Sequence, residues 1–202
     1  MKPVMVKTGI ALLLALGFAI VVSYKYMYPF GQRSSTLPCL YGALFAYAVE
    51  HNGNFPDSGT NAYEALQRLY PDYTPSGIEF AGISGNIDNL VNALRSKARL
   101  SQSLTSLVYI PGLNQNDPPN LALFWESQAG LYPNGRRNFF GGHAVMLVGG
   151  TVTNVAAADW ASFLNWQEHL RKAALAKRVG QTNIPPRRAN SALSGRNQLS
   201  IT

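Results

Sequence analysis

The chain has 202 residues, of which 47% are hydrophobic and 13% are charged, with one cysteine and a formal net charge of +7. This length allows one sizeable hydrophobic core, and the composition is too apolar for a largely disordered protein. A single cysteine excludes an intramolecular disulfide framework and any zinc site built from several cysteines.

The positive charge is concentrated at the two ends of the chain. Residues 1–33 carry four basic residues and no acid, and residues 171–202 carry seven basic residues and no acid. Residues 34–170 carry six basic and ten acidic side chains, so the middle is mildly acidic. Because the basic balance comes from the ends, it does not indicate a nucleic-acid-binding domain, and no nucleic-acid partner is expected.

The amino-terminal segment is long and apolar enough to cross a membrane. No charged residue occurs between Thr8 and Ser23, and with Lys7 snorkelling to the surface, residues 4–23 span about 30 Å at ~1.5 Å per residue. Residues typical of a membrane–water boundary and of a helix end follow: Tyr24, Tyr26, Tyr28, Pro29, Phe30 and Gly31. We expect residues 1–30 to form a retained single-pass anchor in contact with membrane lipid.

A cleaved signal peptide is the alternative for this segment. Signal peptidases need small residues just before the cleavage site, and cleavage after Ser23 would meet this need. However, the flank that begins at Tyr24 is bulky and no Ala-x-Ala motif is present. The flanking charges do not fix the membrane orientation, because Lys2 and Lys7 are balanced by Lys25 and Arg33.

Small residues form a ridge along the expected anchor. Ala11, Ala15 and Ala19 recur every four residues, which places them on one helix face. Such ridges let membrane helices approach closely, so this face is a candidate for packing against other subunits. The alternative is that alanine is simply common in membrane anchors.

The chain behind the anchor predicts an α+β domain over residues 31–178. Apolar residues at three-and-four spacing between Leu37 and Ala48 predict a helix with one buried face, and Ser34-Ser35-Thr36 can cap it. With the anchor, this helix would form a long N-terminal helical stem with a bend at Pro29. Cys39 lies in this helix and is interpreted as a small buried hydrophobe.

Further elements follow in chain order. Short helices are expected after Thr60 and after Asn86, and a final helix is expected from about Ala158 that buries Trp160, Phe163, Leu164 and Leu170. Between them, apolar runs predict antiparallel strands at 104–110, 121–125, 143–148 and 151–155, the last two joined by a Gly-Gly turn. Residues 179–202 are expected to form a disordered basic tail.

Segments of the carboxyl half carry a family resemblance. They read Leu-Val-Tyr-Ile-Pro-Gly-Leu at 107–113, Asn-Asp-Pro-Pro-Asn-Leu-Ala-Leu at 116–123 and Gly-Gly-His-Ala-Val-Met-Leu-Val-Gly-Gly-Thr-Val at 141–152. With the anchored stem, the chain resembles the pilin and type II secretion pseudopilin family, in particular a bacterial group whose hairpin has a His, nine residues, then Asp-Gly-His-Val. The resemblance implies a non-enzymatic structural or assembly component of a secretion or pilus-like system, with its domain on the periplasmic side of the inner membrane.

The sequence departs from the family's motif at several positions. Phe139 stands where the motif has its His, Gly149 stands where it has its Asp, and His143 is displaced by four positions. Chemistry that depends on the motif His and Asp is therefore absent, which favours a structural role. Leu14 stands where the family's prepilin-peptidase signature has a Glu.

The polar residues indicate no catalytic or cofactor-binding site. His51, His143 and His169 are scattered along the chain. Asn114, Asn116 and Asp117 supply oxygen ligands of the kind that calcium prefers, and related pseudopilins have a calcium-stabilised loop in the carboxyl half. The alternative is a turn in which the Asp of Asp-Pro-Pro caps the backbone.

Two other functions follow from other readings of the same chain. A monomeric, anchored, extracytoplasmic binding module for a glycan or peptide could use exposed aromatic residues such as Tyr132 or Trp125. An anchored hydrolase would require His143 to lie beside an acid and a serine in one pocket.

Overall fold

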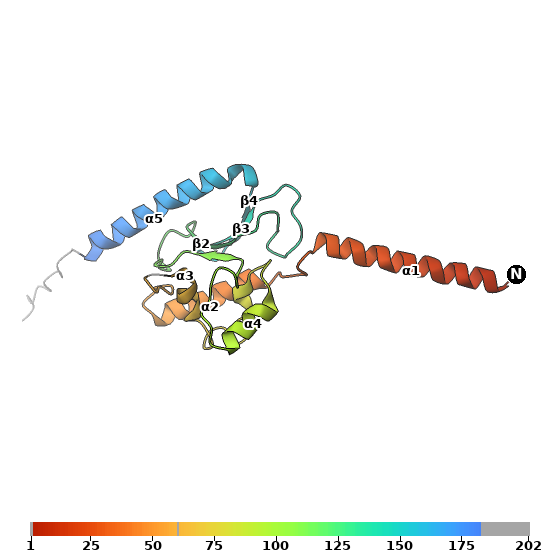
Figure 1. Cartoon of the computed structure of the whole chain (residues 1–202). Coiled ribbons are helices and arrows are strands. Elements are labelled where there is room, and N and C mark those ends of the chain that lie inside the picture. Colours follow the sequence, from red (N-terminus) through yellow and green to blue (C-terminus); the bar gives the residue numbers. More distant parts are fainter. Residues whose placement is uncertain (1, 60, 183–202) are drawn as a thin grey trace, which may run out of the picture.

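A long helix and a folded domain lie end to end in the computed structural model, which describes residues 2–59 and 61–182 (Figure 1). Helix α1 (Lys2–Met27) projects away from the domain. Residues 28–35, which we call the linker, contain no helix and lead into α2 (Thr36–Glu50). The stem is therefore interrupted between α1 and α2, at the place where the sequence predicts a bend and a helix end. Pro29 and Gly31, with a φ of 79°, end α1 at this point.

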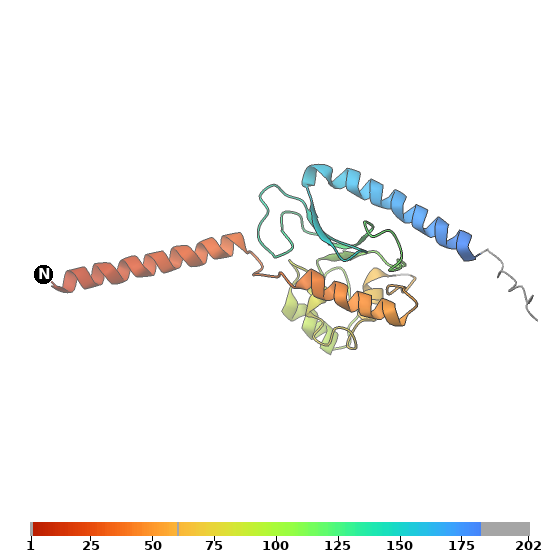
Figure 2. The ribbon, with the colours of Figure 1, turned by 180° about the vertical axis from the view of Figure 1, so that it is seen from behind.

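The domain is a small sheet between two helical layers (Figures 1 and 2). Helices α2, α3 (Ala62–Gln67) and α4 (Ile87–Arg95), with the 3-10 turn η1 (Ile78–Ala81), cover one face. Helix α5 (Trp160–Thr182) crosses the other face, preceded by the 3-10 turn η2 (Ala157–Asp159). This arrangement confirms the predicted α+β class.

The sheet is an antiparallel meander of four short strands in the order β1-β2-β3-β4. They are β1 (Leu107–Tyr109), β2 (Ala122–Glu126), β3 (His143–Leu147) and β4 (Val152–Val155). The Gly-Gly turn between β3 and β4 is where the sequence places it, and β1 is shorter than predicted. Because side chains alternate along a strand, Phe124 and Met146 face α2, whereas their neighbours Trp125 and Val145 face α5.

The main core lies between the sheet and α2. Leu37, Leu40, Leu44 and Ala48 are completely buried, as their spacing predicts. Cys39 is exposed, which corrects the prediction of a buried thiol. It lies about 160° around the helix from the buried Leu37, so it falls on the opposite side from the sheet.

The outer face of α2 is apolar, although no other element of the described residues covers it. Its exposed residues are Pro38, Cys39, Gly42, Phe45, Ala46 and Val49, and the charged Glu50 is exposed at the end of the helix. Seen from behind, α2 lies at the front of the domain with no other element across it (Figure 2). An apolar face of this kind on a described helix is unusual for a free monomer.

Helix α5 packs on the sheet less fully than predicted. Trp160 and Phe163 are partly buried and Leu170 packs against the core, but Leu164 is exposed. Gln167 and Ala174 are its buried residues, and the Gln167 side chain accepts from Ala122 N at 2.7 Å and donates to Asn120 O at 3.0 Å. Helix α5 also runs to Thr182, into the segment 179–202 predicted to be disordered, and residues 183–202 lie outside the described residues.

Candidate functional site: the membrane anchor and its junction

Between Gly9 and Ser23, helix α1 is apolar on all sides and is covered by no other part of the described chain. Its large hydrophobic side chains from Ile10 to Val22 are 48% to 72% exposed. A helix that is hydrophobic all round requires an apolar environment on every face. The 19 residues Gly9–Met27 are long and apolar enough to span a membrane, at about 28 Å for ~1.5 Å per residue.

The alanine ridge lies on one side of α1. Ala11, Ala15 and Ala19 follow one another at steps of four residues, which keeps them within about 80° of one another around the helix. All three are exposed. The structure therefore leaves this face open for another helix, and its packing role stays a prediction.

The linker holds the domain against the end of α1 through its backbone. Phe30 packs against the core, and the backbone N of Arg33 donates to Asn134 O at 3.0 Å. The linker also passes close to Gly135, where a Cβ would lie 2.6 Å from the carbonyl oxygen of Gly31. Because Gly135 has a φ of 83°, glycine is favoured here by both conformation and space.

A loop between β2 and β3 packs against the last turn of α1 and forms hydrogen bonds with it. We call residues 127–142 the junction loop. The backbone N of its Arg137 donates to Met27 O at 2.7 Å, and the guanidinium Nε donates to Tyr26 O at 3.2 Å. The guanidinium carbon of Arg137 lies 5.0 Å from the centre of the Tyr26 ring, in cation–π geometry. Phe139 stacks on the same tyrosine, with ring centroids 5.9 Å apart.

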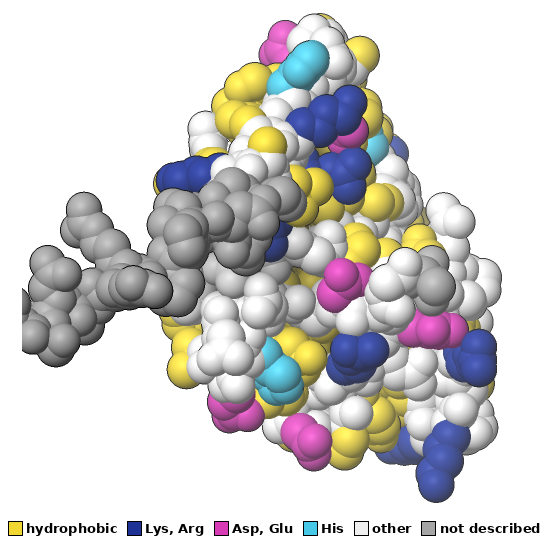
Figure 3. Space-filling view, turned by 90° about the vertical axis from the view of Figure 1, so that its left-hand side faces the viewer, with side chains coloured by type: hydrophobic (Ala, Val, Ile, Leu, Met, Phe, Trp, Pro, Cys, Tyr) yellow, Lys and Arg dark blue, Asp and Glu magenta, His cyan; other side chains and the backbone are white. Residues whose placement is uncertain are grey.

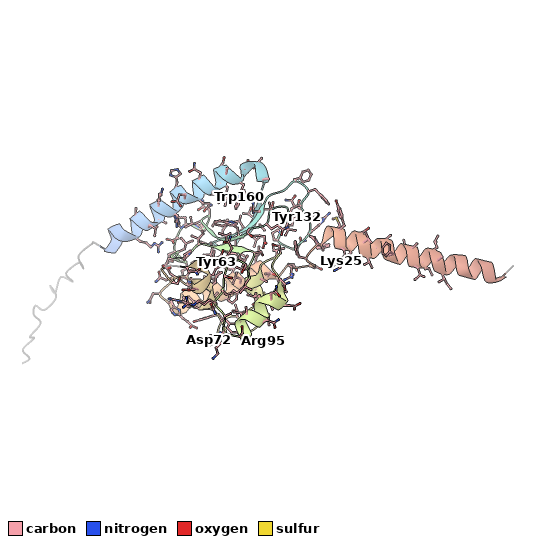
Figure 4. The ribbon with its side chains drawn as sticks, in the orientation of Figure 1. Lys25, Tyr63, Asp72, Arg95, Tyr132 and Trp160 are labelled. Carbon is pink, nitrogen blue, oxygen red and sulfur yellow. The ribbon has the colours of Figure 1, made fainter. Side chains whose placement is uncertain are left out.

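The junction loop has a defined backbone because its own polar groups are bonded. Asn138 is buried and its backbone N donates to Gly130 O at 2.8 Å, while its side-chain Nδ2 donates to Asn154 Oδ1 at 3.1 Å. Asn154 in turn donates to Leu131 O at 3.1 Å. Tyr132 of this loop lies near the end of α1 that carries Lys25 (Figure 4). The anchor therefore enters the domain at a bonded junction and not through a free hinge.

The candidate calcium ligands are bonded to groups of the protein. Oδ2 of Asp117 accepts from Asn114 N at 2.8 Å and lies 3.2 Å from Nη2 of Arg178 on α5. Oδ1 of Asn114 accepts from Asn116 N at 2.9 Å, and its Nδ2 donates to Asn54 Oδ1 at 3.0 Å. A guanidinium thus balances the buried carboxylate, and the three residues form a closed turn that ties the loop to α5.

His143 contacts Glu126 only through the main chain. Its Nδ1 bonds to Glu126 O at 2.8 Å, and its ring stacks on Trp160 at 4.0 Å, on the α5 side of the sheet. The Glu126 carboxylate lies on the other face, where it accepts from Ile83 N at 2.7 Å and from the Ser84 hydroxyl. The His143 ring and the Glu126 carboxylate therefore lie on opposite faces of the sheet.

Burial raises the pKa of Glu126 above its ordinary value. The hydrogen bonds that its carboxylate accepts act in the opposite direction and are outweighed. Because the side chain is fully buried and bonded to Ile83 and Ser84, just after η1, it joins β2 to the helical layer. This role is structural.

The remaining histidines lie apart from one another and from His143. His51 ends α2, where its ring stacks on Tyr47 at 3.7 Å and its Nδ1 bonds to Tyr47 O at 2.7 Å. His169 is exposed on α5. Within residues 2–59 and 61–182, no group of three or more His, Cys, Asp or Glu residues is placed to hold a metal ion.

The two aromatic residues proposed for ligand binding are on different surfaces. Tyr132 belongs to the junction loop, whereas Trp125 lies under α5, in edge contact with Trp160 at 5.8 Å. Trp125 also lines a hollow of about 280 Å³ with Leu164, Gln167 and Arg171. The structure therefore does not bring the two into one binding site.

Comparison with known proteins gives no family for the chain: no family model, curated protein or solved structure matches it. Within residues 2–59 and 61–182, one helix is long and apolar enough to span a membrane, and an α+β domain follows it.

Proposed function

We propose that the chain is a non-enzymatic, membrane-anchored protein of the pseudopilin-like type, and a structural or assembly component of a secretion or pilus-like system of the cell envelope. Its domain would lie outside the cytoplasm. The observation that carries this proposal is the uncovered apolar helix α1, which is joined to the domain by hydrogen bonds to Tyr26 and Met27. A bonded junction lets contacts between anchors fix the positions of their domains.

The outer face of α2 supports assembly over an isolated monomer. Phe45 and Val49 are 43% and 61% exposed on a helix that carries no charge until Glu50. Together with the alanine ridge on α1, the chain offers two apolar helix faces, one within the membrane and one just outside it. Burying the α2 face against other subunits would remove apolar surface from water. The alanine ridge would instead allow close packing of helices within the lipid.

Cross-linking within the membrane tests assembly through the alanine ridge. In a Cys39→Ser background, Ala15→Cys should form a disulfide-linked adduct with a second copy or a partner carrying a matched cysteine. Leu13→Cys is the matched control, since it lies about 160° around the helix from Ala15. Equal adduct yields from the two variants, or none from either, would contradict packing through the ridge.

The native cysteine tests the second apolar face. Cys39 is exposed on the outer side of α2 and is the one cysteine of the sequence. If α2 helices pack side by side in the assembly, mild oxidation of membranes should give a Cys39-linked dimer, because disulfides require Cα atoms within about 7 Å. Oxidation of the detergent-dispersed protein at the same concentration is the control and should give less dimer.

A monomeric binding module for a glycan or peptide is the alternative. The hollow beside Trp125 favours it, although its volume of about 280 Å³ is at the small end for a ligand site. The alternative predicts ligand binding that does not depend on assembly, measured with the full chain diluted into nanodiscs that each hold one copy. Binding that appears only in assembled membranes would count against it.

A further inference from the structure

Two adjacent phenylalanines of the junction loop face outward beside the anchor. Phe139 is 60% exposed and Phe140 is 89% exposed, although the loop backbone around them is bonded. Asn138 holds this geometry, because its Oδ1 accepts from Phe140 N at 3.1 Å. A loop fixed in this way holds both rings on its surface. Exposing two apolar rings to water is unfavourable, so their position calls for an apolar partner.

The anchor sets the depth of these rings relative to a membrane. Tyr26 lies three residues beyond Ser23, the end of the uncharged span, which is about 4.5 Å along the helix. Phe139 stacks directly on Tyr26, so it lies at nearly the same depth. Tyrosine and phenylalanine at this level occupy the boundary between the hydrocarbon core and the headgroups.

The charged residues of the junction loop and of the end of α1 that it contacts are all basic. The junction loop and the first 35 residues contain no acid, and Lys25, Arg33, Arg136 and Arg137 gather where these segments meet. By contrast, the opposite end of the domain mixes basic, acidic and hydrophobic side chains (Figure 3). An open hollow of about 400 Å³ lies beside Arg137 and Phe139, lined also by Gly130 and Gly141.

We propose that the junction loop is a second membrane contact, in which Phe139 and Phe140 enter the membrane–water interface and Arg136 and Arg137 bind the phosphates of anionic lipid headgroups. This proposal rests on α1 being a membrane anchor. The loop and the anchor then hold the lipid surface at two points, which fixes the tilt of the domain over the membrane. Aromatic residues supply the apolar contact, and each basic residue near an anionic surface adds attraction.

Depth-dependent fluorescence quenching tests the proposal on the full chain. Three single variants, Phe140→Trp, Phe18→Trp and Phe45→Trp, are reconstituted into phosphatidylcholine vesicles with brominated acyl chains, with and without about one quarter phosphatidylglycerol. The unmodified chain gives the background of its own tryptophans. Phe45 is the matched control, since it is an exposed phenylalanine on the soluble part of the chain.

We expect bromine to quench the added fluorescence of Phe140→Trp at least about twofold more than that of Phe45→Trp. Phosphatidylglycerol should increase the quenching of Phe140→Trp, and adding Arg136→Gln and Arg137→Gln should remove that increase. Quenching of Phe18→Trp without quenching of Phe140→Trp would overturn the loop proposal while the anchor stands. Quenching of neither would show that α1 is not inserted, and both proposals would fail.

Two further outcomes would also overturn the proposal. Quenching of Phe140→Trp that is equal with and without phosphatidylglycerol would remove the role given to the arginines. Fluorescence that changes with the protein-to-lipid ratio and not with bromine would show that a second copy of the chain covers the rings.

Discussion

The buried carboxylate of Glu126 gives the most quantitative prediction for the domain. It accepts hydrogen bonds from Ile83 N and the Ser84 hydroxyl, so Glu126→Ala would leave the buried N–H of Ile83 and the half-buried hydroxyl of Ser84 without this acceptor. Each such donor costs about 1–3 kcal/mol, and the cavity adds to this. We expect Glu126→Ala to lose about 3–5 kcal/mol of unfolding free energy. Glu126→Gln keeps the volume and one acceptor, and should lie within about 2 kcal/mol of the unmodified protein.

The pH dependence of stability separates the charge of Glu126 from its hydrogen bonds. Because burial raises the folded-state pKa above the unfolded value, the folded protein holds this proton more tightly than the unfolded chain. The stabilisation from the protonated acid is fully present below the unfolded pKa of about 4.3, and it is lost as pH rises through the folded pKa. The slope between the two pKa values is at most about 1.4 kcal/mol per pH unit. Glu126→Gln should abolish this slope.

Urea unfolding of the detergent-solubilised protein, followed by tryptophan fluorescence across pH 4 to 8, measures both effects. Asp72→Asn, at an exposed position, is the control and should leave the pH profile unchanged. A loss below about 1 kcal/mol for Glu126→Ala, or an unchanged slope in Glu126→Gln, would refute the reasoning.

Three other outcomes are expected. Asp117→Asn weakens the pair with Arg178, so it should lower the unfolding temperature, whereas added calcium should leave the unmodified protein's unfolding temperature unchanged; a calcium-dependent rise would show a metal site in this loop. Arg137→Gln removes the side-chain contacts with Tyr26 at the end of α1, so limited proteolysis should cut the linker faster. The unfolding free energy of the domain should change by less than about 1 kcal/mol. An unchanged cleavage rate would contradict the stabilisation of the linker by Arg137. Gly135→Ala meets the Gly31 carbonyl and a positive φ, so it should cost about 1–3 kcal/mol in denaturant titrations, and a neutral effect would disprove the close approach.

Periodicity predicted the elements whose burial follows a repeating pattern. The spacing of Leu37, Leu40 and Leu44 gave the buried face of α2, and Asn86 caps α4 as expected. The Gly-Gly turn predicted the β3–β4 hairpin. These signals are local, because each depends on residues within one or two turns of chain.

The missed features depend on contacts between distant segments. The contact of Arg137 with Tyr26 joins residues 111 positions apart, so no local pattern reveals it. The Asp117–Arg178 pair is similar, since an Asp-Pro-Pro turn gives no sign of its partner on α5. The exposure of Cys39 could have been predicted from the sequence, because Cys39 does not lie on the helix face that Leu37 and Leu40 define.

Two residues did carry a signal that went unused. Glu126 follows Phe124 by two positions in an apolar strand, and strand alternation places both on the same buried face. Phe139, where the resembling group has a His, is followed by Phe140 and preceded by two arginines. That combination of aromatic and basic residues is typical of a membrane interface.

The most direct measurement of the central claim is the amino-terminal sequence of the protein recovered from a washed membrane fraction. An anchor that stays in the bilayer predicts a terminus that includes Val4 and the whole uncharged span. A terminus at Tyr24, with the protein in the soluble fraction, would contradict the account, because the helix that carries it would have been removed.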